Sequence, residues 1–255
     1  MIYQKQYNLS CMISGWSERY SKIIKEFKFD EQKDNKSSIQ LNSLLKNTNT
    51  NNKLTNLIRG KTVTIIGSGP SLSRNIGKIG KLSKITKIAA DSSAKILVEN
   101  QIFPEIIVTD LDGDKQTLEK LARTSSIFVV HAHGDNIEKI KIAKKFKHMI
   151  GTTQSTPFDK LQNFGGFTDG DRAVFLASHF GAEKIILVGM DFGSRIGRYS
   201  YTKKSERNLK LKKLKQGREL LEWLSTFTNS KLFTTSKPIK GFTKISFNDL
   251  DTIIT

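Results

Sequence analysis

The sequence predicts an α/β fold built on a doubly wound, mostly parallel sheet. Short apolar runs rich in β-branched residues recur after residue 59, and each is followed by a polar or glycine-containing break and a helix-compatible segment. Near-continuous apolar strands that alternate with helices are typical of parallel sheets covered on both faces, so we expect a Rossmann-like sheet with an N-terminal helical appendage. A length of 255 residues suits one main domain with a small appendage. We place the helical region at 1–58 and the Rossmann-like domain, including a basic C-terminal helix, at 59–255.

The N-terminal region opens with an amphipathic pattern whose apolar residues are spaced by three and four, which predicts a helix. These residues are Trp16, Tyr20, Ile23, Ile24 and Phe27. The polar stretch 47–52 is a loop or linker signal, although the leucines on either side of it keep helical spacing. We therefore expect packed helices before a core domain that starts near Arg59.

Seven strands are expected after that point. They are Val63–Ile66, Ile85–Ala90, Ile106–Thr109, Ile127–Val130, Met149–Thr153, Ile185–Val188 and Lys231–Thr234. A helix that ends near Phe180 is expected, with Thr168 or Asp169 as its cap, and a second helix is expected at 115–122, after Asp114.

The composition is strongly basic. Lys and Arg number 42 against 24 acidic residues, which gives a net charge of +18 and favours phosphates or nucleic acid as partners. The single cysteine, Cys11, excludes an intrachain disulfide framework and a multi-cysteine zinc site. No apolar run approaches the ~20 residues that span a bilayer, and the first residues lack a hydrophobic signal core. We expect a soluble, cytoplasmic protein without membrane contact, and the sequence leaves its oligomeric state open, a homo-oligomer included.

Polar residues gather where the predicted strands end. In open α/β sheets, ligands bind outside the carboxyl ends of the strands. The pattern therefore predicts one crevice lined by glycines, hydroxyls, carboxylates and imidazoles. The loops in question are Gly67–Ser71, Asp91–Ser93, Asp110–Asp114, His131–Asp135, Thr152–Gln154 and Gly189–Asp191.

The first of these loops is predicted to bind nucleotide phosphate. Glycines after a strand allow close backbone approach, and the start of the following helix offers free N–H groups. The residues are Gly67, Ser68, Gly69, Pro70 and Ser71. Leu72 stands at the third glycine position of a dinucleotide fingerprint, and the Gly-Lys-Ser/Thr ending of a Walker A loop is absent. The alternative is a tight strand-to-helix turn capped by Ser71.

Asp110, Asp112 and Asp114 place three carboxylates within five residues, beside Gly113. Their repulsion is costly unless a cation is near, and hard oxygen ligands suit Mg²⁺, which completes its shell with water and substrate phosphates. An EF-hand needs a longer loop and a terminal glutamate. The alternative is a solvated turn in which Asp114 caps a helix.

His131, His133 and Asp135 alternate, so on an extended strand end they project to the same side. The triplet resembles the His-x-His-x-Asp-His motif of metallo-β-lactamase-type zinc hydrolases, but Asn136 stands in place of the last histidine. The alternative is a histidine pair satisfied by neighbouring loops.

The segment 163–172 is a turn-rich lead into a helix. Phe164 and Phe167 flank a glycine pair and could stack a flat ring, while Asp169 could accept hydrogen bonds from ring N–H groups. The alternative is that both phenylalanines pack in the core.

Ten basic residues and one acidic residue lie between Arg195 and Arg218. Leucines at helical spacing beneath them predict an amphipathic helix with a cationic outer face. A solvated face, a phosphate-contacting lid and a nucleic-acid surface are the three interpretations.

The motif strings together resemble the archaeal 6-hydroxymethyl-7,8-dihydropterin pyrophosphokinase family over roughly residues 61–193. The strings are Gly67–Leu72, Val108–Gly113, His131–Asn136, Thr152–Gln154, Asn163–Ala173 and Gly189–Gly193. The first 60 residues and the basic tail are not diagnostic.

The resemblance implies Mg²⁺-dependent transfer of the β,γ-diphosphate of ATP to the pterin hydroxymethyl group, with release of AMP, in tetrahydromethanopterin or folate synthesis. ATP and a reduced pterin are thus the expected partners. Transfer of this kind depends on a metal clamp and a positioned nucleophile. The expected catalytic and metal-binding residues are Asp110, Asp112 and Asp135. The expected nucleotide-binding residues are Gly67–Ser71, His131 and His133. The expected substrate-binding residues are Asp91, Gln154, Asn163, Phe167, Asp169 and Arg172.

Three other functions stay open. The acidic Asp110–Gly113 turn is similar to the metal motif of thiamine pyrophosphokinases, and the wider family includes proteins that resemble nucleotide-sugar glycosyltransferases. A nucleic-acid-binding protein is the alternative that involves no enzyme, motivated by the charge of +18. Three clustered aspartates argue against a nucleic-acid groove.

Overall fold

The computed structural model describes residues 12–46, 48–82, 85–200 and 202–254; Cys11 and the first ten residues lie outside this part of the chain. A sheet of nine strands, all paired in parallel, forms the centre of the molecule in the order β6-β5-β4-β3-β2-β1-β7-β8-β9. The strands are β1 Thr62–Ile66, β2 Thr86–Ala90, β3 Ile106–Thr109, β4 Ile127–Ala132, β5 Met149–Thr153, β6 Leu161–Gln162, β7 Lys184–Val188, β8 Lys231–Thr234 and β9 Thr243–Lys244. The predicted doubly wound α/β fold is confirmed.

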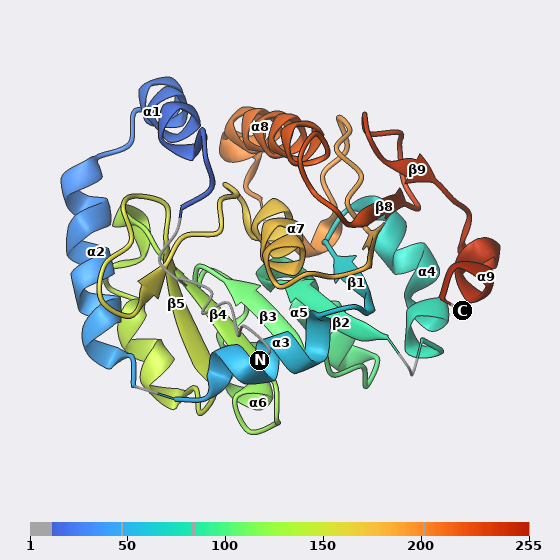
Figure 1. The fold of residues 1–255 in the computed structure, drawn as a ribbon, viewed down its shortest axis with the longest axis horizontal. Helices are drawn as coiled ribbons and strands as arrows, with labels where there is room; N and C mark the ends of the chain where they lie inside the picture. Colours follow the sequence, from blue (N-terminus) through green and yellow to red (C-terminus); the bar gives the residue numbers. More distant parts are fainter. Residues whose placement is uncertain (1–11, 47, 83–84, 201, 255) are drawn as a thin grey trace, which may run out of the picture.

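Helices cover both faces of the sheet (Figure 1). The helices are α1 Trp16–Phe27, α2 Glu31–Leu44, α3 Thr50–Ile58, α4 Pro70–Gly80, α5 Asp91–Glu99, α6 Lys115–Leu121, α7 Asp169–His179, α8 Arg207–Leu224 and α9 Leu250–Ile254. Side chains of α1, α3, α7 and α8 pack on one face, and those of α4, α5 and α6 pack on the other. No helix in the described part of the chain has the length and apolar character needed to cross a bilayer.

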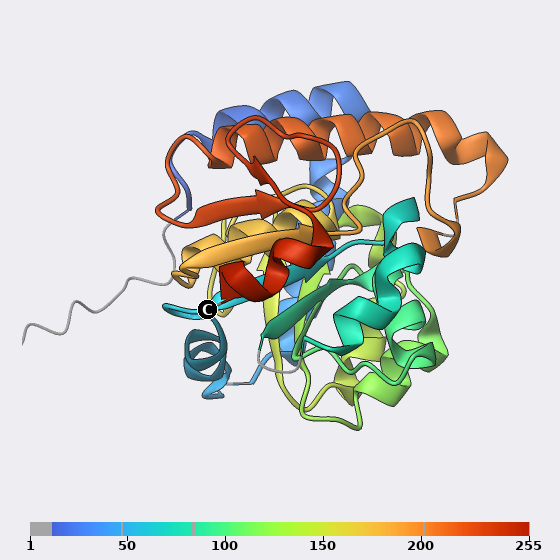
Figure 2. The ribbon, with the colours of Figure 1, turned by 90° about the vertical axis from the view of Figure 1, so that its right-hand side faces the viewer.

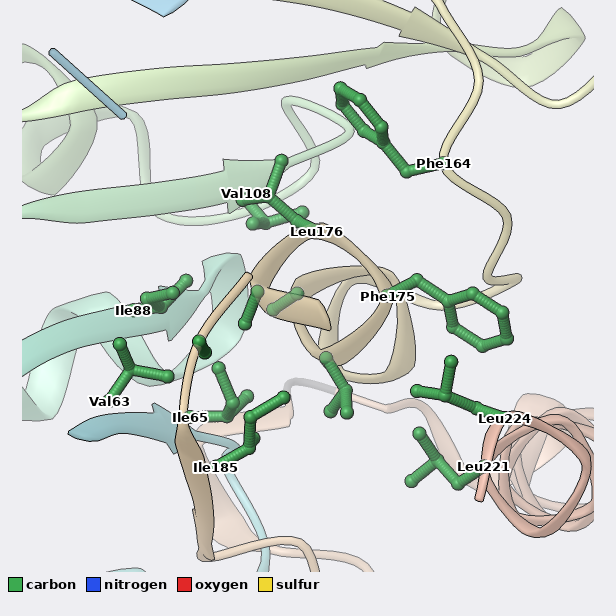
Figure 3. Close-up of a cluster of buried hydrophobic side chains, with 14 of the residues drawn as sticks. Val63, Ile65, Ile88, Val108, Phe164, Phe175, Leu176, Ile185, Leu221 and Leu224 are labelled. Atoms are coloured by element: carbon green, nitrogen blue, oxygen red, sulfur yellow. The ribbon is translucent and has the colours of Figure 1, made fainter. Parts of the chain in front are cut away.

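The larger core lies between the sheet and α7. Figure 3 shows Val63, Ile65 and Ile185 pointing from the sheet toward α7, and Leu221 and Leu224 pointing from α8 toward the same helix. All five side chains are at most 1% exposed. Burial of an aliphatic side chain of this size contributes about 1.5–3 kcal/mol, so this layer fixes α7 and α8 against the strands.

The N-terminal helices pack on the same core. The Trp16 ring meets the Phe175 ring of α7 edge-on, with centroids 6.4 Å apart. Arg19 lies over the Trp223 ring of α8 at 3.8 Å from its centroid, and Figure 2 shows α8 running along the top of the molecule with α1 behind it. The division of the chain near Arg59 stays a prediction.

Most predicted elements are present with small differences. The bounds of β3, β5 and β8 are as predicted, and the other four predicted strands differ by one or two residues. The two-residue strands β6 and β9 were not predicted, because such short pairs carry no periodic pattern. Asp114 caps α6 by accepting from the Thr117 amide at 2.9 Å. Thr168, one of the two predicted caps, caps α7 in a capping box with Asp171.

The sheet has its topological switch point between β1 and β7. The chain runs outward from β1 through β2 to β6, then returns to place β7 on the other side of β1. The loops that follow β1 and β7 therefore diverge and leave a crevice at the carboxyl edge.

Candidate active site

Three carboxylates meet at the carboxyl ends of the central strands. Asp91 follows β2, Asp110 follows β3, and Asp169 begins α7. One oxygen from each residue lies within 4.8 Å of the oxygens of the other two. We call Asp91, Asp110 and Asp169 the carboxylate cluster. Negative charges this close repel each other strongly unless a cation neutralises them.

Asp91 is engaged on one oxygen only. Its Oδ2 atom accepts hydrogen bonds from the Thr109 hydroxyl at 2.5 Å and from the Gly113 amide at 2.9 Å. Its Oδ1 atom is buried and has no hydrogen-bond partner among the described residues. Burial, followed by the charge of Asp110, raises the pKa of Asp91 to about 7. An unpaired buried carboxylate oxygen is destabilising by itself, and this atom fits the role of a cation ligand.

The loop after β3 turns one aspartate inward and the next outward. Leu111 has a φ of 67°, in the left-handed region that non-glycine residues rarely adopt, and its side chain is buried. Across this turn, the Asp110 side chain is 25% exposed. Asp112 is 61% exposed and pairs with Lys139 at 3.3 Å. At Gly113 a Cβ atom would collide with the Asp91 carboxylate, so the residue must be glycine for its amide to approach.

Among the three cluster residues, Asp110 is the one whose ionised carboxylate is stabilised by its neighbours. The Nε2 atom of His133 lies 3.4 Å from its Oδ2 atom. Because Nδ1 of His133 accepts from the Asp135 amide at 3.3 Å, a neutral ring carries its proton on Nε2, which faces Asp110. Burial alone would raise the pKa of Asp110, but the contact with His133 and two nearby cations outweigh burial and lower the pKa. The cations are Arg172 and Lys213.

A buried arginine positions Asp169. The Arg172 side chain is 4% exposed, and its Nη1 atom lies 3.3 Å from Oδ1 of Asp169. Its Nη2 atom donates to the Phe167 carbonyl at 3.2 Å. Gly166 has a φ of 88°, and a Cβ atom there would collide with the Arg172 backbone. Burial, together with the charge of Asp110, raises the pKa of Asp169 well above its ordinary value.

A pocket of about 640 Å³, including the part open to solvent, adjoins the cluster at the switch point. Its walls are the loops after β1 and β7, the start of α7, the segment 195–197 and one side of α8. Asp169 belongs to both the pocket and the cluster. The hydroxyl groups of Ser68 and Ser92, 2.7 Å apart, and the cations Arg195 and Lys210 also line it. The pocket therefore offers donors to an anionic ligand that reaches the cluster.

The loop after β1 uses its amides within the protein. Gly67 N donates to the Val188 carbonyl at 2.9 Å, and Gly69 N donates to the Gly189 carbonyl at 2.7 Å. The Ser71 amide donates to Asp191 Oδ2 at 2.8 Å, and Pro70 has no N–H. Ser71 is not the helix cap; Gly69 holds that position. Gly67, Ser68 and Gly69 line the pocket, while their predicted phosphate contact stays a prediction.

The histidine loop is tied together by Asn136. Its Nδ2 atom donates to the carbonyl groups of Asp110 and His131, each at 2.7 Å. This bridge explains why an asparagine suits the position where a zinc hydrolase has histidine. His131 is 2% exposed, and burial lowers its pKa well below the ordinary value, so the ring is neutral. Asp135 is exposed in the turn Gly134–Asn136 and is not part of the carboxylate cluster.

The remaining predicted substrate residues are buried among internal partners. Gln154 Nε2 donates to Oδ2 of Asp34 at 2.8 Å, and Asn163 Nδ2 donates to the Ser155 carbonyl at 2.8 Å. Phe164 is 2% exposed and packs in the core. Phe167 is 9% exposed and belongs to the same core, where its ring packs against two rings of the N-terminal region with centroids 4.8 and 6.0 Å away. Those rings are Phe27 and Phe29.

Lys210 and Lys213 belong to the basic segment 195–218 whose lid interpretation included Lys210, whereas Asp34 was not predicted. Lys210 and Lys213 lie on the side of α8 that faces the site, and Lys213 Nζ is 5.7 Å from the Phe29 ring centroid. Their spacing continues to Gly217, whose close approach to Asp171 sets α8 against α7. This spacing of three and then four residues, which places all three on one side of a helix, was the available signal. Asp34 is 3% exposed and carried no signal in the sequence. Of its side-chain partners only Tyr20 is close in the chain, and Gly134 and Gln154 lie about 100 residues or more away.

Comparisons with known proteins settle the family. The family model described as 6-hydroxymethylpterin diphosphokinase MptE-like matches residues 40–197. The chain belongs to this family. Membership confirms the predicted resemblance and, with it, the predicted enzyme class, a diphosphokinase.

Curated archaeal relatives align over most of the MptE-like chain. A protein of Methanocaldococcus jannaschii named 6-hydroxymethyl-7,8-dihydropterin pyrophosphokinase is 44% identical over 82% of this chain and 94% of its own length. The protein of that name from Pyrococcus furiosus is 40% identical over 85% of this chain and 96% of its own. Among solved structures, the MAf glycosyltransferase of Magnetospirillum magneticum matches with a TM-score of 0.56 at 15% identity, over 83% of this chain and 39% of that one. This last match shows a shared fold.

Proposed function

We propose that this MptE-like chain transfers a diphosphate group from ATP to the hydroxymethyl group of 6-hydroxymethyl-7,8-dihydropterin and releases AMP. The names of relatives at 37–44% identity support the acceptor and the reaction. The observation that carries the proposal is the carboxylate cluster with its unpaired Asp91 oxygen, beside a pocket lined by cations and hydroxyl groups.

The cluster fits Mg²⁺ better than the loop carboxylates alone. Hard oxygen ligands converge from Asp91, Asp110 and Asp169, whereas Asp112 and Asp135 are exposed outside the cluster. We therefore propose the cluster residues as the metal ligands, in place of the predicted set that combined Asp110 with the two exposed residues. When bound, Mg²⁺ would neutralise charge on the transferred phosphates.

The protein side chains divide the site into two halves. On the pocket side, Arg195 and Lys210 would bind the phosphates of ATP, because both cations line the same pocket as Asp169. On the other side, the acceptor ring would lie near Phe29 and Phe167, whose apolar surfaces adjoin Lys213. The Nε2–H group of His133 would hold Asp110 in place from within the protein.

The test is AMP release from ATP with Mg²⁺ and the reduced pterin, comparing Asp169→Asn with Asp135→Asn. Both variants remove one carboxylate, but only Asp169 is in the cluster. We expect Asp169→Asn to lose about a thousandfold or more in turnover and Asp135→Asn to stay within about threefold of wild type, because transition-state charge is stabilised by the metal.

Two outcomes would contradict the proposal. One is the reverse ranking of the two variants, provided that each has a wild-type circular dichroism spectrum. The other is AMP release with thiamine in place of the pterin, or transfer from a nucleotide sugar, at a rate that exceeds the pterin reaction.

A further inference from the structure

A second cavity adjoins the pocket beside the carboxylate cluster and shares Asp191 and Arg195 with it, but it contains no residue of the cluster. It is formed by α4, the loop after β7 and the loop after β8, which Figure 1 places together toward the right of the molecule. Its volume is about 1080 Å³, including the part open to solvent. Four cations line it, and we call it the cationic groove. The cations are Arg74, Arg195, Lys237 and Lys244.

The groove carries an excess of positive charge. Its one carboxylate, Asp191, already accepts hydrogen bonds from the Ser71 amide and the Ser236 hydroxyl, each at 2.8 Å. Within the described part of the chain, none of the four cations pairs with a carboxylate. Like charges in one hollow raise the local potential and attract an anion.

Hydroxyl groups and an aromatic ring extend the groove. Thr235 and Ser236 line it beside the cations. A neighbouring hollow shares Thr235 and Lys244 and adds Phe247, over whose ring Lys78 Nζ lies at 5.7 Å from the centroid. The hydroxyl groups of Thr235 and Ser236 donate to the Leu187 carbonyl and to Asp191, so the phosphate donors of the groove are its cations. The neighbouring hollow adds a ring against which a flat group can pack.

We propose that the cationic groove binds the diphosphate group of a phosphorylated ligand, at a site separate from the carboxylate cluster. The carboxylate cluster and the cationic groove differ in whether they bind an anion without a metal ion. Without a divalent cation the three carboxylates of the cluster repel an anion, whereas the groove attracts it. The proposal therefore does not depend on the transfer reaction.

The experiment is calorimetric titration of the full chain with inorganic pyrophosphate in EDTA. The wild-type protein should show one saturable site. The double variant Arg74→Gln/Lys237→Gln should bind about tenfold or more weakly, because two charge-assisted contacts are lost. The matched control is Lys81→Gln/Lys240→Gln, which also removes two exposed cations, from the end of α4 and from the loop after β8, but outside the groove. Its affinity should stay within about twofold of wild type.

Three outcomes would overturn the proposal. They are the absence of saturable binding to the wild-type protein, an equal loss of affinity in the control, and a loss in Lys210→Gln/Lys213→Gln that the groove variant does not share. Two results distinguish the source of the diphosphate. If ADP binds more tightly than pyrophosphate and Phe247→Ala weakens the binding of ADP, the ligand of the groove is a nucleotide. If ADP and pyrophosphate bind with equal affinity and Phe247→Ala changes neither affinity, the ligand is inorganic diphosphate.

Discussion

Replacing Asp91 by asparagine should stabilise the metal-free protein at alkaline pH although it removes a proposed metal ligand. Burial and the charge of Asp110 raise the pKa of Asp91 from 3.8 to about 7. A carboxyl group whose pKa is higher in the folded state contributes stability that is complete below the unfolded pKa and is lost as the pH rises through the folded pKa. The wild-type protein should therefore lose free energy of unfolding between about pH 4 and pH 7, and change little above that.

The size of this effect follows from the shift. A difference of about three pH units corresponds to about 4 kcal/mol. Asparagine keeps an oxygen for the Thr109 hydroxyl and the Gly113 amide, and it places an NH₂ group where Oδ1 of Asp91 has no partner. Because this NH₂ group is crowded by Gly113, we expect a net gain of about 2 kcal/mol at pH 8.

Urea unfolding in EDTA at pH 5 and pH 8 measures the prediction. The gain in Asp91→Asn should be largest at pH 8 and should shrink at pH 5, where wild-type Asp91 is protonated. Asp112→Asn is the control, because that side chain is 61% exposed and should change stability by less than about 0.5 kcal/mol. Added Mg²⁺ should stabilise the wild-type protein and not Asp91→Asn. A loss of stability in Asp91→Asn that is equal at both pH values would show that the Asp91 charge does not destabilise the folded protein.

Three further predictions concern activity and stability. Lys213→Gln should lower kcat/KM about tenfold, because it removes a cation that lowers the pKa of a cluster carboxylate, while Lys212→Gln on the exposed side of α8 should not; equal effects in steady-state assays would contradict this. Turnover at limiting Mg²⁺ should rise with pH through about 7 as Asp91 ionises, with protons released on metal binding in calorimetry; a flat profile would count against Asp91 as a ligand. Gly69→Val should lower the free energy of unfolding by about 2 kcal/mol or more, since a Cβ atom there collides with the Asp191 carboxylate and the Gly189 carbonyl; wild-type stability in thermal unfolding would show that the loop can relax.

The strands could be predicted because their side chains obey a local rule. Runs such as Ile106–Thr109 and Met149–Thr153 are rich in β-branched residues and are bounded by turn residues, and their predicted bounds match the structure. The carboxyl edge could be predicted for the same reason, since parallel strands place their following loops together. Asp91 and Asp110 were selected from sequence on this basis, whereas Asp169 was selected from the turn-rich segment 163–172.

The partnership of the carboxylates could not be predicted. Asp110 and Asp112 are close in the chain, but the left-handed turn at Leu111 separates them, and leucine is a residue that gives no signal for such a turn. Asp169 reaches the cluster because α7 packs across the sheet, and this tertiary packing is not encoded in the local sequence around Asp169. Likewise, the glycines at 67 and 69 indicate close backbone approach, but the sequence does not say that the approaching group is the loop after β7.

Binding of Mn²⁺, measured by electron paramagnetic resonance, tests whether the carboxylate cluster holds the divalent cation as proposed. Asp110→Asn and Asp112→Asn are the matched pair, because they remove neighbouring carboxylates from the same loop. We predict that Asp110→Asn weakens Mn²⁺ binding about a hundredfold, whereas Asp112→Asn binds within about threefold of wild type. Loss of binding in Asp112→Asn, with binding retained in Asp110→Asn, would contradict the account.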